Sequence, residues 1–278
     1  MQEKPERLYL DLMKKALSFT IWPEPPKELE PLPRYGLLKR QSISLFNRIL
    51  QPANLVICKT SDASKDDREE GKMWPSYAHT MVGLKRLDNI QHCIETVLQN
   101  NVDGDFIETG VWRGGTCILM RAVLAAYGIE NRKVYVADSF EGLPKPSAEK
   151  YPADKGDRHY RRSELAISKE EVESNFAKYG LLDDQVVFLQ GWFKDTLPKA
   201  PIEKLAILRL DGDMYESTID ALNNLYFKLS PGGFCIIDDY FLEGCRKAVD
   251  DFRSENGISE QIETIDWGAV YWVKGVLR

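Results

Sequence analysis

The sequence predicts an α/β fold, with a parallel β-sheet covered by helices on both faces. From residue 105 onward, short apolar runs alternate with helical stretches, which is the pattern of a parallel sheet. A Gly-rich turn, ETGVWRGGT, follows the first run, and two later runs end on carboxylates, at Asp211 and at Asp238 with Asp239. Because such sheets bind ligands beyond the carboxyl ends of their strands, these residues are candidates for a functional site.

The composition excludes several classes of protein. The 278 residues are 43% hydrophobic and carry a net charge of -6, with the basic residues spread along the chain rather than gathered in a stripe that would bind nucleic acid. The five cysteines form no CxxC pair, which is typical of reduced thiols. No apolar run approaches the roughly 18 residues of a membrane span. We expect a cytoplasmic protein without nucleic-acid or membrane partners.

The first 80 residues lack the alternation of strands and helices found in the rest of the chain. We predict an N-terminal extension, 1–80, followed by a catalytic domain, 81–278. A helix is expected from the apolar stripe Leu8, Leu12, Ala16 and Phe19. The proline-rich spacer 22–33 follows it. Such a helix has no core of its own, so it either packs on its own domain or docks on a second subunit. The charged stretch 61–80 is expected to be a mobile loop before a helix at about Leu84–Gln99.

Five apolar runs are the predicted parallel strands: 105–109, 133–138, 185–190, 205–211 and 233–239. Helices fit between them, notably 117–128 and 218–233, the second ending on Pro-Gly-Gly. Two alternating runs, 261–267 and 269–275, predict an antiparallel hairpin. Five parallel strands finished by a terminal hairpin are the outline of the Rossmann-like class I methyltransferase sheet, rather than of a dinucleotide dehydrogenase.

The turn after the first strand predicts a site for a nucleotide-like cofactor. Gly110 permits a tight turn and Gly114 a close approach of backbone to ligand. The spacing is not GxGxxG, and bulky residues fill the turn, which counts against a pyrophosphate. Glu108 suits instead the cationic amino and sulfonium groups of S-adenosylmethionine. The complete predicted set for this cofactor is Thr80, Met81, Glu108, Thr109, Gly110, Arg113, Gly114, Asp138, Ser139, Gly191, Trp192 and Asp211.

Two members of this set have a competing interpretation. Asp138, at the tip of the second strand, is placed to accept hydrogen bonds from both ribose hydroxyls, or else it caps a helix. Trp192 follows the third strand, where it either covers the adenine or belongs to the core.

The carboxylates at the ends of the fourth and fifth strands predict a metal site. Two bare carboxylates about 4 Å apart repel by roughly 4 kcal/mol at an effective dielectric near 20, so Asp211, Asp238 and Asp239 require a positive partner. An all-oxygen set suits Mg²⁺ or Ca²⁺ rather than zinc. The alternative is that these acids cap helices or pair with Arg209 and Arg246. We expect Asp213 to support the site without binding the metal.

The sequence resembles the macrocin O-methyltransferase family, metal-dependent enzymes that methylate sugar hydroxyls in macrolide and aminocoumarin antibiotic biosynthesis. The resemblance runs from about Tyr77 to the C-terminus, in blocks such as FIETGVWRGG, ADSFEGLP, LRLDGDMYESTIDAL and LSPGGFCIIDDY. It implies S-adenosylmethionine as methyl donor, Mg²⁺ on Asp211, Asp238 and Asp239, and a homodimer or higher homo-oligomer. It also implies that the N-terminal part helps to shape the pocket of a small-molecule glycoside acceptor.

Methyl transfer requires the positioning of two substrates and the removal of a proton from a weakly acidic hydroxyl. We expect Asp211 to be the base, with His159, in a polar insertion between the second and third strands, as the competing candidate. Three other classes are weighed: an NAD-dependent dehydrogenase, a non-enzymatic scaffold that binds S-adenosylmethionine, and a catechol-type O-methyltransferase acting on a small phenol. Only the acceptor pocket separates the last from a sugar methyltransferase.

Overall fold

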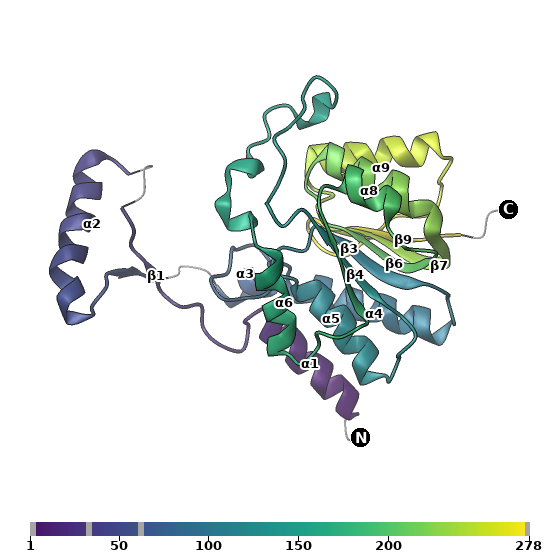
Figure 1. Cartoon of the computed structure of the whole chain (residues 1–278), viewed down its shortest axis with the longest axis horizontal. Helices are drawn as coiled ribbons and strands as arrows, with labels where there is room; N and C mark the ends of the chain where they lie inside the picture. Colours follow the sequence, from purple (N-terminus) through teal and green to yellow (C-terminus); the bar gives the residue numbers. More distant parts are fainter. Residues whose placement is uncertain (1–3, 32–34, 61–63, 276–278) are drawn as a thin grey trace.

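The computed structural model describes residues 4–31, 35–60 and 64–275, so the end of the predicted spacer and the start of the predicted charged loop lie outside it. Its main sheet has seven strands in the order β5-β4-β3-β6-β7-β9-β8 (Figure 1). The strands are β3 (Asp105–Thr109), β4 (Val134–Asp138), β5 (Val186–Gln190), β6 (Leu205–Leu210), β7 (Leu229–Ile237), β8 (Glu263–Thr264) and β9 (Val270–Val273). Strands β3 to β7 are parallel and the β8–β9 hairpin is antiparallel, which confirms the predicted sheet.

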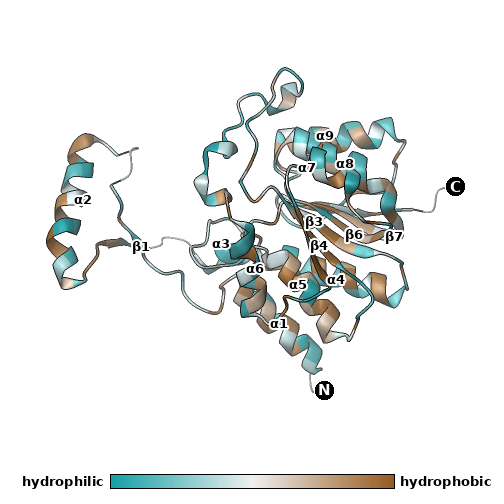
Figure 2. Cartoon of the chain, viewed as in Figure 1, coloured by the Kyte–Doolittle hydropathy of each residue, from teal (hydrophilic) through white to brown (hydrophobic). Residues whose placement is uncertain are grey.

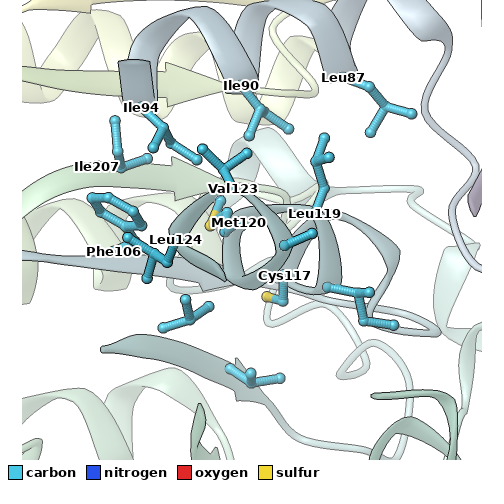
Figure 3. Packing of buried hydrophobic residues seen from close by; sticks show 14 of the residues in the cluster. Leu87, Ile90, Ile94, Phe106, Cys117, Leu119, Met120, Val123, Leu124 and Ile207 are labelled. Carbon is cyan, nitrogen blue, oxygen red and sulfur yellow. The ribbon is translucent and has the colours of Figure 1, made fainter. Parts of the chain in front are cut away.

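Helices cover both faces of this sheet (Figure 1). On one face lie α1 (Pro5–Leu17), α4 (Leu84–Gln99), α5 (Gly115–Ala126) and α6 (Lys169–Lys178). On the other lie α8 (Tyr215–Leu225) and α9 (Glu243–Glu255), with the short α7 (Phe193–Thr196) beside α8. The side chains of α4 and α5 interdigitate over β3 and β6 (Figure 3), and this dry core holds the strand ends in fixed positions.

The helix before β7 ends earlier than predicted. It stops at Leu225, and β7 begins at Leu229, so the Pro-Gly-Gly segment lies inside the strand rather than at the end of the helix. The pairing with β6 shifts register here, because Leu205 pairs with Leu229 and Ile207 with Phe234. The extra residues form a bulge, a position that accepts proline and glycine within a strand.

The helix expected from the stripe of Leu8, Leu12, Ala16 and Phe19 is α1, and it packs on α5 of its own chain through a different face. Leu8 and Leu12 are more than half exposed, whereas Leu10, Met13 and Leu17 are buried. Both stripes have helical spacing, so periodicity by itself did not distinguish them. Of the two positions considered for this helix, the structure shows the intramolecular one.

The remainder of the N-terminal part forms an arm that stands away from the sheet (Figures 1 and 2). It contains β1 (Lys27–Glu28), α2 (Leu37–Leu50) and β2 (Cys58–Lys59), with β1 and β2 paired antiparallel. Farther along, the predicted charged loop contains a short helix, α3 (Lys65–Glu69), which Ser64 and Asp67 stabilise with a capping box. Among the described residues, no helix is both long and apolar enough to cross a membrane.

Candidate active site

A cavity of about 310 Å³ opens at the carboxyl ends of β3, β4, β6 and β7, where the predicted residues converge. The backbone at the ends of β3 and β6 touches directly. Gly110 has φ +86°, and a Cβ atom there would lie 1.7 Å from the carbonyl oxygen of Asp211. Only glycine fits, so the backbone of the predicted cofactor turn is in direct contact with that of Asp211, the first carboxylate of the predicted metal set.

Residues 76–81 are held against the cofactor turn from both sides. Arg113 donates hydrogen bonds to the carbonyl oxygens of Ser76, at 3.0 Å, and Ala78, at 2.9 Å. At the end of α1, the Leu17 carbonyl accepts from the backbone N–H of His79 at 2.8 Å. This strap places Thr80 and Met81 in the wall of the cavity, and it makes α1 part of the support of the site.

Glu108 and Asp138 line the cavity but already have partners in the protein. The Glu108 carboxylate accepts hydrogen bonds from Thr116 and Cys117 and pairs with Arg209. Burial raises the pKa of Glu108, and the Arg209 charge opposes that rise. The structure therefore gives this carboxylate a resident cation where the cofactor's positive groups were expected.

The Asp138 carboxylate organises two turns. Its oxygens accept the backbone N–H of Val111 and of Phe140, each at 2.8 Å. It does not cap a helix, which was the competing interpretation. The Ser139 hydroxyl donates a third, longer bond to Oδ1 at 3.4 Å, and because a carboxylate has about four lone-pair sites, some acceptor capacity is left toward the cavity.

Asp211, Asp238 and Asp239 converge as predicted, each contributing an oxygen within 4.8 Å of the others. Two buried arginines lie among them. Arg209 pairs with Asp211 and Asp238, and Arg86, from the first turn of α4, donates to the other oxygen of Asp238 at 2.5 Å. The alternative of pairing with Arg209 is thus partly realised. Arg86 was missed, because nothing in the sequence near residue 86 indicates contact with residue 238.

Acidic groups still outnumber the cations at this edge of the sheet. Glu108, Asp211, Asp213, Asp238 and Asp239 face two arginines, and Arg86 also pairs with Asp266. Burial, followed by the charge of Asp238, raises the pKa of Asp211 to about 8. Burial also raises the pKa of Asp213, to about 6, and that of Asp239 well above its usual range. An all-oxygen cluster short of positive charge fits a hard divalent cation.

Asp213 and His159 complete the polar part of the cavity. Asp213 has φ +58°, a strained conformation for a residue other than glycine, and such conformations concentrate at functional sites. Among the described residues, no hydrogen-bond or ion-pair partner is found for its carboxylate. His159 lies in the insertion, residues 139–168, between β4 and α6, and its Nδ1 is 2.7 Å from Oδ2 of Asp157.

Most of the predicted site residues line the cavity: Thr80, Met81, Glu108, Gly110, Asp138, Ser139, His159, Trp192, Asp211, Asp238 and Asp239. Four do not line it: Thr109, Arg113, Gly114 and Gly191. Gly114 instead faces Val172, and Gly191 faces Thr196.

Aromatic residues that sequence reasoning missed also line the cavity, among them Trp112, Phe241 and Trp267. The rings of Phe241 and Trp267 have centroids 4.7 Å apart, and the Arg86 guanidinium lies 5.2 Å from the Trp267 ring centre. They come from segments distant in the sequence from Arg86, so no local pattern indicates that they meet.

This strand order, with a ligand cavity at the carboxyl ends of its parallel strands, defines a class I methyltransferase. Residues 6–274 match the macrocin-O-methyltransferase (TylF) family model, and the chain belongs to that family. As a member it is an O-methyltransferase, and the family implies S-adenosylmethionine as the methyl donor. An NAD-dependent dehydrogenase and a non-enzymatic scaffold are therefore set aside.

Similar proteins cover nearly the whole chain. The "8-demethyl-8-(2,3-dimethoxy-alpha-L-rhamnosyl)-tetracenomycin-C 4'-O-methyltransferase" of Streptomyces olivaceus is 52% identical over 98% of this chain and 94% of its own. The mycinamicin III 3''-O-methyltransferase of Micromonospora griseorubida is 50% identical over 85% of this chain and 94% of its own. The solved structure of the O-methyltransferase NovP has a TM-score of 0.83 at 46% identity, covering 98% of this chain and 100% of that one.

Proposed function

We propose that the enzyme transfers a methyl group from S-adenosylmethionine to a sugar hydroxyl of a glycosylated natural product, in a Mg²⁺-dependent reaction. The observation that carries this proposal is the contact between the Gly110 turn and Asp211, which joins the cofactor wall to the carboxylate cluster. The tetracenomycin relative, whose name specifies a rhamnosyl acceptor, supports the acceptor class.

The donor would be held by the wall formed by Thr80, Met81, Gly110, Asp138, Ser139 and Trp192. The spare acceptor capacity of Asp138 suits ribose hydroxyls, and the Trp192 ring suits the adenine. Thr109, Arg113, Gly114 and Gly191 would act from behind this wall, by fixing the backbone that forms it.

Asp211, Asp238 and Asp239 would hold the Mg²⁺. A divalent cation held there would supply positive charge to stabilise the developing negative charge of the acceptor oxygen. Arg86 and Arg209 fix the orientation of Asp238. One oxygen of each of the three carboxylates lies within 4.8 Å of the others.

Three residues compete for the role of base. Asp211, expected from the sequence, is paired with Arg209 and belongs to the metal set. His159 is held by Asp157 and lies in the insertion. Asp213 lines the cavity with a carboxylate that makes no hydrogen bond or ion pair among the described residues, and the charges of His159 and Arg162 act on it. We therefore assign the proton transfer to Asp213, with Asp211 as a metal ligand.

The acceptor would lie beside Phe241 and Trp267. Arg86 contacts both Asp238 and the Trp267 ring, so a hydroxyl that reaches the carboxylates brings its sugar ring next to this aromatic pair. Both rings are 45% exposed and present apolar surface on which the C–H face of a sugar can pack. A small phenol is the alternative acceptor, and the experiment below includes one.

We also propose a homodimer or higher homo-oligomer that uses the arm, and a division of the chain near residue 80, with α1 packed back on the core of the catalytic domain. Five apolar side chains of α2 are more than half exposed: Leu37, Leu38, Leu45, Phe46 and Ile49. A helix with this much uncovered apolar surface, held away from its own core, is typical of a subunit contact. The free cysteines, four of them buried, support a cytoplasmic location.

Calorimetric titration with S-adenosylmethionine, S-adenosylhomocysteine and NAD⁺, each with Mg²⁺ and with EDTA, tests the donor. We expect binding of the first two and none of NAD⁺. Methylation is then assayed with the dimethoxyrhamnosyl tetracenomycin named for the S. olivaceus relative and with catechol. Mg²⁺-dependent methylation of the sugar supports the proposal, whereas methylation of catechol alone overturns the acceptor class.

A further inference from the structure

Asp154 caps a helix that begins 61 residues farther along the chain. Its Oδ1 accepts the backbone N–H of Tyr215 at 2.7 Å, and its Oδ2 accepts that of Glu216 at 3.0 Å. These are the first two residues of α8, whose own N-cap residue, Met214, provides no side-chain hydrogen bond. Asp154 is only 2% exposed, so its carboxylate is committed to these two N–H groups and to the positive end of the helix.

This contact joins two segments that carry polar residues of the cavity. On one side, α8 directly follows the turn that contains Asp211 and Asp213, and the Asp213 N–H donates to Asp239 at 3.1 Å. On the other side, Asp154 lies in the insertion, five residues before His159. A second, smaller cavity borders Asp154, Asp157 and Asp213 together, which confirms that the insertion and the turn face each other there.

The far end of the insertion is attached to the cofactor turn. The indole Nε1 of Trp112 donates to the Glu164 carbonyl at 2.8 Å. The insertion is thus fixed near its C-terminal end, through Glu164, to the turn after β3, and near its middle, through Asp154, to the helix that follows the carboxylates. His159 lies between these two attachments.

We propose that Asp154 is a positioning residue for the methyl transfer: it sets the distance between the His159 segment and the Asp213 turn across the acceptor part of the cavity. This inference rests on the proposed function, because it assumes that the acceptor binds between these segments. If Asp154 instead only caps α8, its removal lowers stability and leaves the kinetics unchanged.

Two kinds of variant disturb this contact: substitutions of Asp154 itself, and a substitution of the neighbouring Gly244. Asp154→Ala removes both acceptors, and Asp154→Asn retains one of them. Gly244→Ala retains the Asp154 side chain, but a Cβ atom at Gly244 would lie 2.8 Å from Oδ1 of Asp154 and 3.2 Å from the backbone N of Tyr215, and would therefore crowd the contact between them. We expect kcat with the dimethoxyrhamnosyl tetracenomycin to fall roughly 10- to 100-fold in Asp154→Ala, as for other misplaced reacting groups. Asp154→Asn and Gly244→Ala should show smaller losses.

Ser168→Ala provides the matched control. Ser168 is the last residue of the same insertion and caps α6, where its hydroxyl accepts the Glu171 N–H at 3.2 Å. Its loss should lower the melting temperature with kcat unchanged. In the Asp154 variants, affinity for S-adenosylhomocysteine should also be unchanged, because the donor wall does not include this contact. If Asp154→Ala behaves as Ser168→Ala does, with a lower melting temperature and normal kcat, the positioning role is wrong.

Hydrogen exchange separates failure of this inference from failure of the proposed function. With S-adenosylhomocysteine and Mg²⁺ present, the amides of 155–162 and 213–216 should exchange faster in Asp154→Asn and Gly244→Ala than in wild type. This measurement requires no acceptor. Unchanged exchange in 155–162 overturns the inference even if the wild-type enzyme methylates the sugar. If exchange is faster in these variants but the wild-type enzyme methylates no sugar, the inferred link between Asp154 and the 155–162 segment is supported and the proposed function is overturned.

Discussion

Asp213 is the single residue whose substitution tests the chemistry most directly. Its backbone is strained, and its carboxylate lines the cavity without a hydrogen-bond or ion-pair partner among the described residues. The neighbouring Asp211 does have a partner, because Nη1 of Arg209 lies 2.8 Å from its Oδ2. Two acids separated by one glycine thus have different environments, and we attribute different roles to them.

Asp213→Asn should lower kcat by roughly 10²- to 10⁴-fold, the usual contribution of a general base. Affinity for S-adenosylhomocysteine should be unchanged, because Asp213 is outside the donor wall. His159→Ala should have a smaller effect, and Asp220→Asn, which alters another acid lining the cavity, serves as control. Steady-state kinetics with saturating donor measures all three. Abolished turnover in His159→Ala together with near-normal turnover in Asp213→Asn would make His159 the base.

At the scale of secondary-structure elements, α1 belongs to the support of the cofactor wall. It buries Leu10 and Leu17 against the core that contains α4 and α5, and its last carbonyl binds the strap that carries Thr80. The part of the chain before residue 80 therefore includes one element that is integral to the catalytic domain and another, α2, that is not packed on it.

Leu10→Ala should destabilise the protein by about 2 to 5 kcal/mol, because a fully buried leucine leaves a cavity when truncated. Leu8→Ala, on the exposed face of the same helix, should change stability by about 0.5 kcal/mol or less. Urea denaturation at fixed pH measures both. Equal losses would show that the two faces of α1 are buried alike, for example in an oligomer.

The exposed face of α2 predicts the behaviour of the arm. Replacing Leu38 and Leu45 together by aspartate places two charges among the apolar side chains and should dissociate the oligomer. Ser44→Asp adds a charge at an exposed polar position of the same helix and should not. Sedimentation velocity gives the oligomeric state of each variant. A wild-type protein that sediments as a monomer would contradict the proposed assembly.

At the scale of the whole molecule, the carboxylate edge of the sheet makes stability depend on pH. The pKa of Asp211 is raised to about 8 and that of Asp213 to about 6 in the folded protein, against about 3.9 in the unfolded chain. A carboxyl group with a raised folded pKa contributes stability that is present below its unfolded pKa and is lost as pH rises through the folded value. Without metal, stability should therefore decline between about pH 4 and pH 8 through these groups.

The melting temperature in EDTA should fall as pH rises from 6 to 8.5, and the increase produced by Mg²⁺ should be larger at pH 8.5. The reason is that protons compete with the cation for the same oxygens. Asp239→Asn removes one of the proposed ligands and should reduce the Mg²⁺ effect at both pH values. Differential scanning calorimetry in buffers of equal ionic strength measures the melting temperature with Mg²⁺ and with EDTA at each pH. An equal Mg²⁺ increase at the two pH values would argue against a metal bound by these acids.

The local sequence was sufficient for the strands, because a buried parallel strand is a continuous apolar run and its end is marked by the first polar residue. The runs at 105–109 and 205–211 match β3 and β6 almost residue for residue. The bulge in β7 was not predicted, because proline and glycine usually end an element, and only the pairing with β6 keeps them in the strand.

By itself the sequence determined the fold class, the family and the convergence of Asp211, Asp238 and Asp239, because strand order brings the ends of adjacent parallel strands together. Only the tertiary structure decided what surrounds them. Arg86 and Trp267 reach the cavity from α4 and the hairpin turn, and Asp154 reaches the start of α8 from the insertion. Contacts between segments so far apart in the chain depend on how helices and loops pack on the sheet, and no local pattern of residue types encodes that packing.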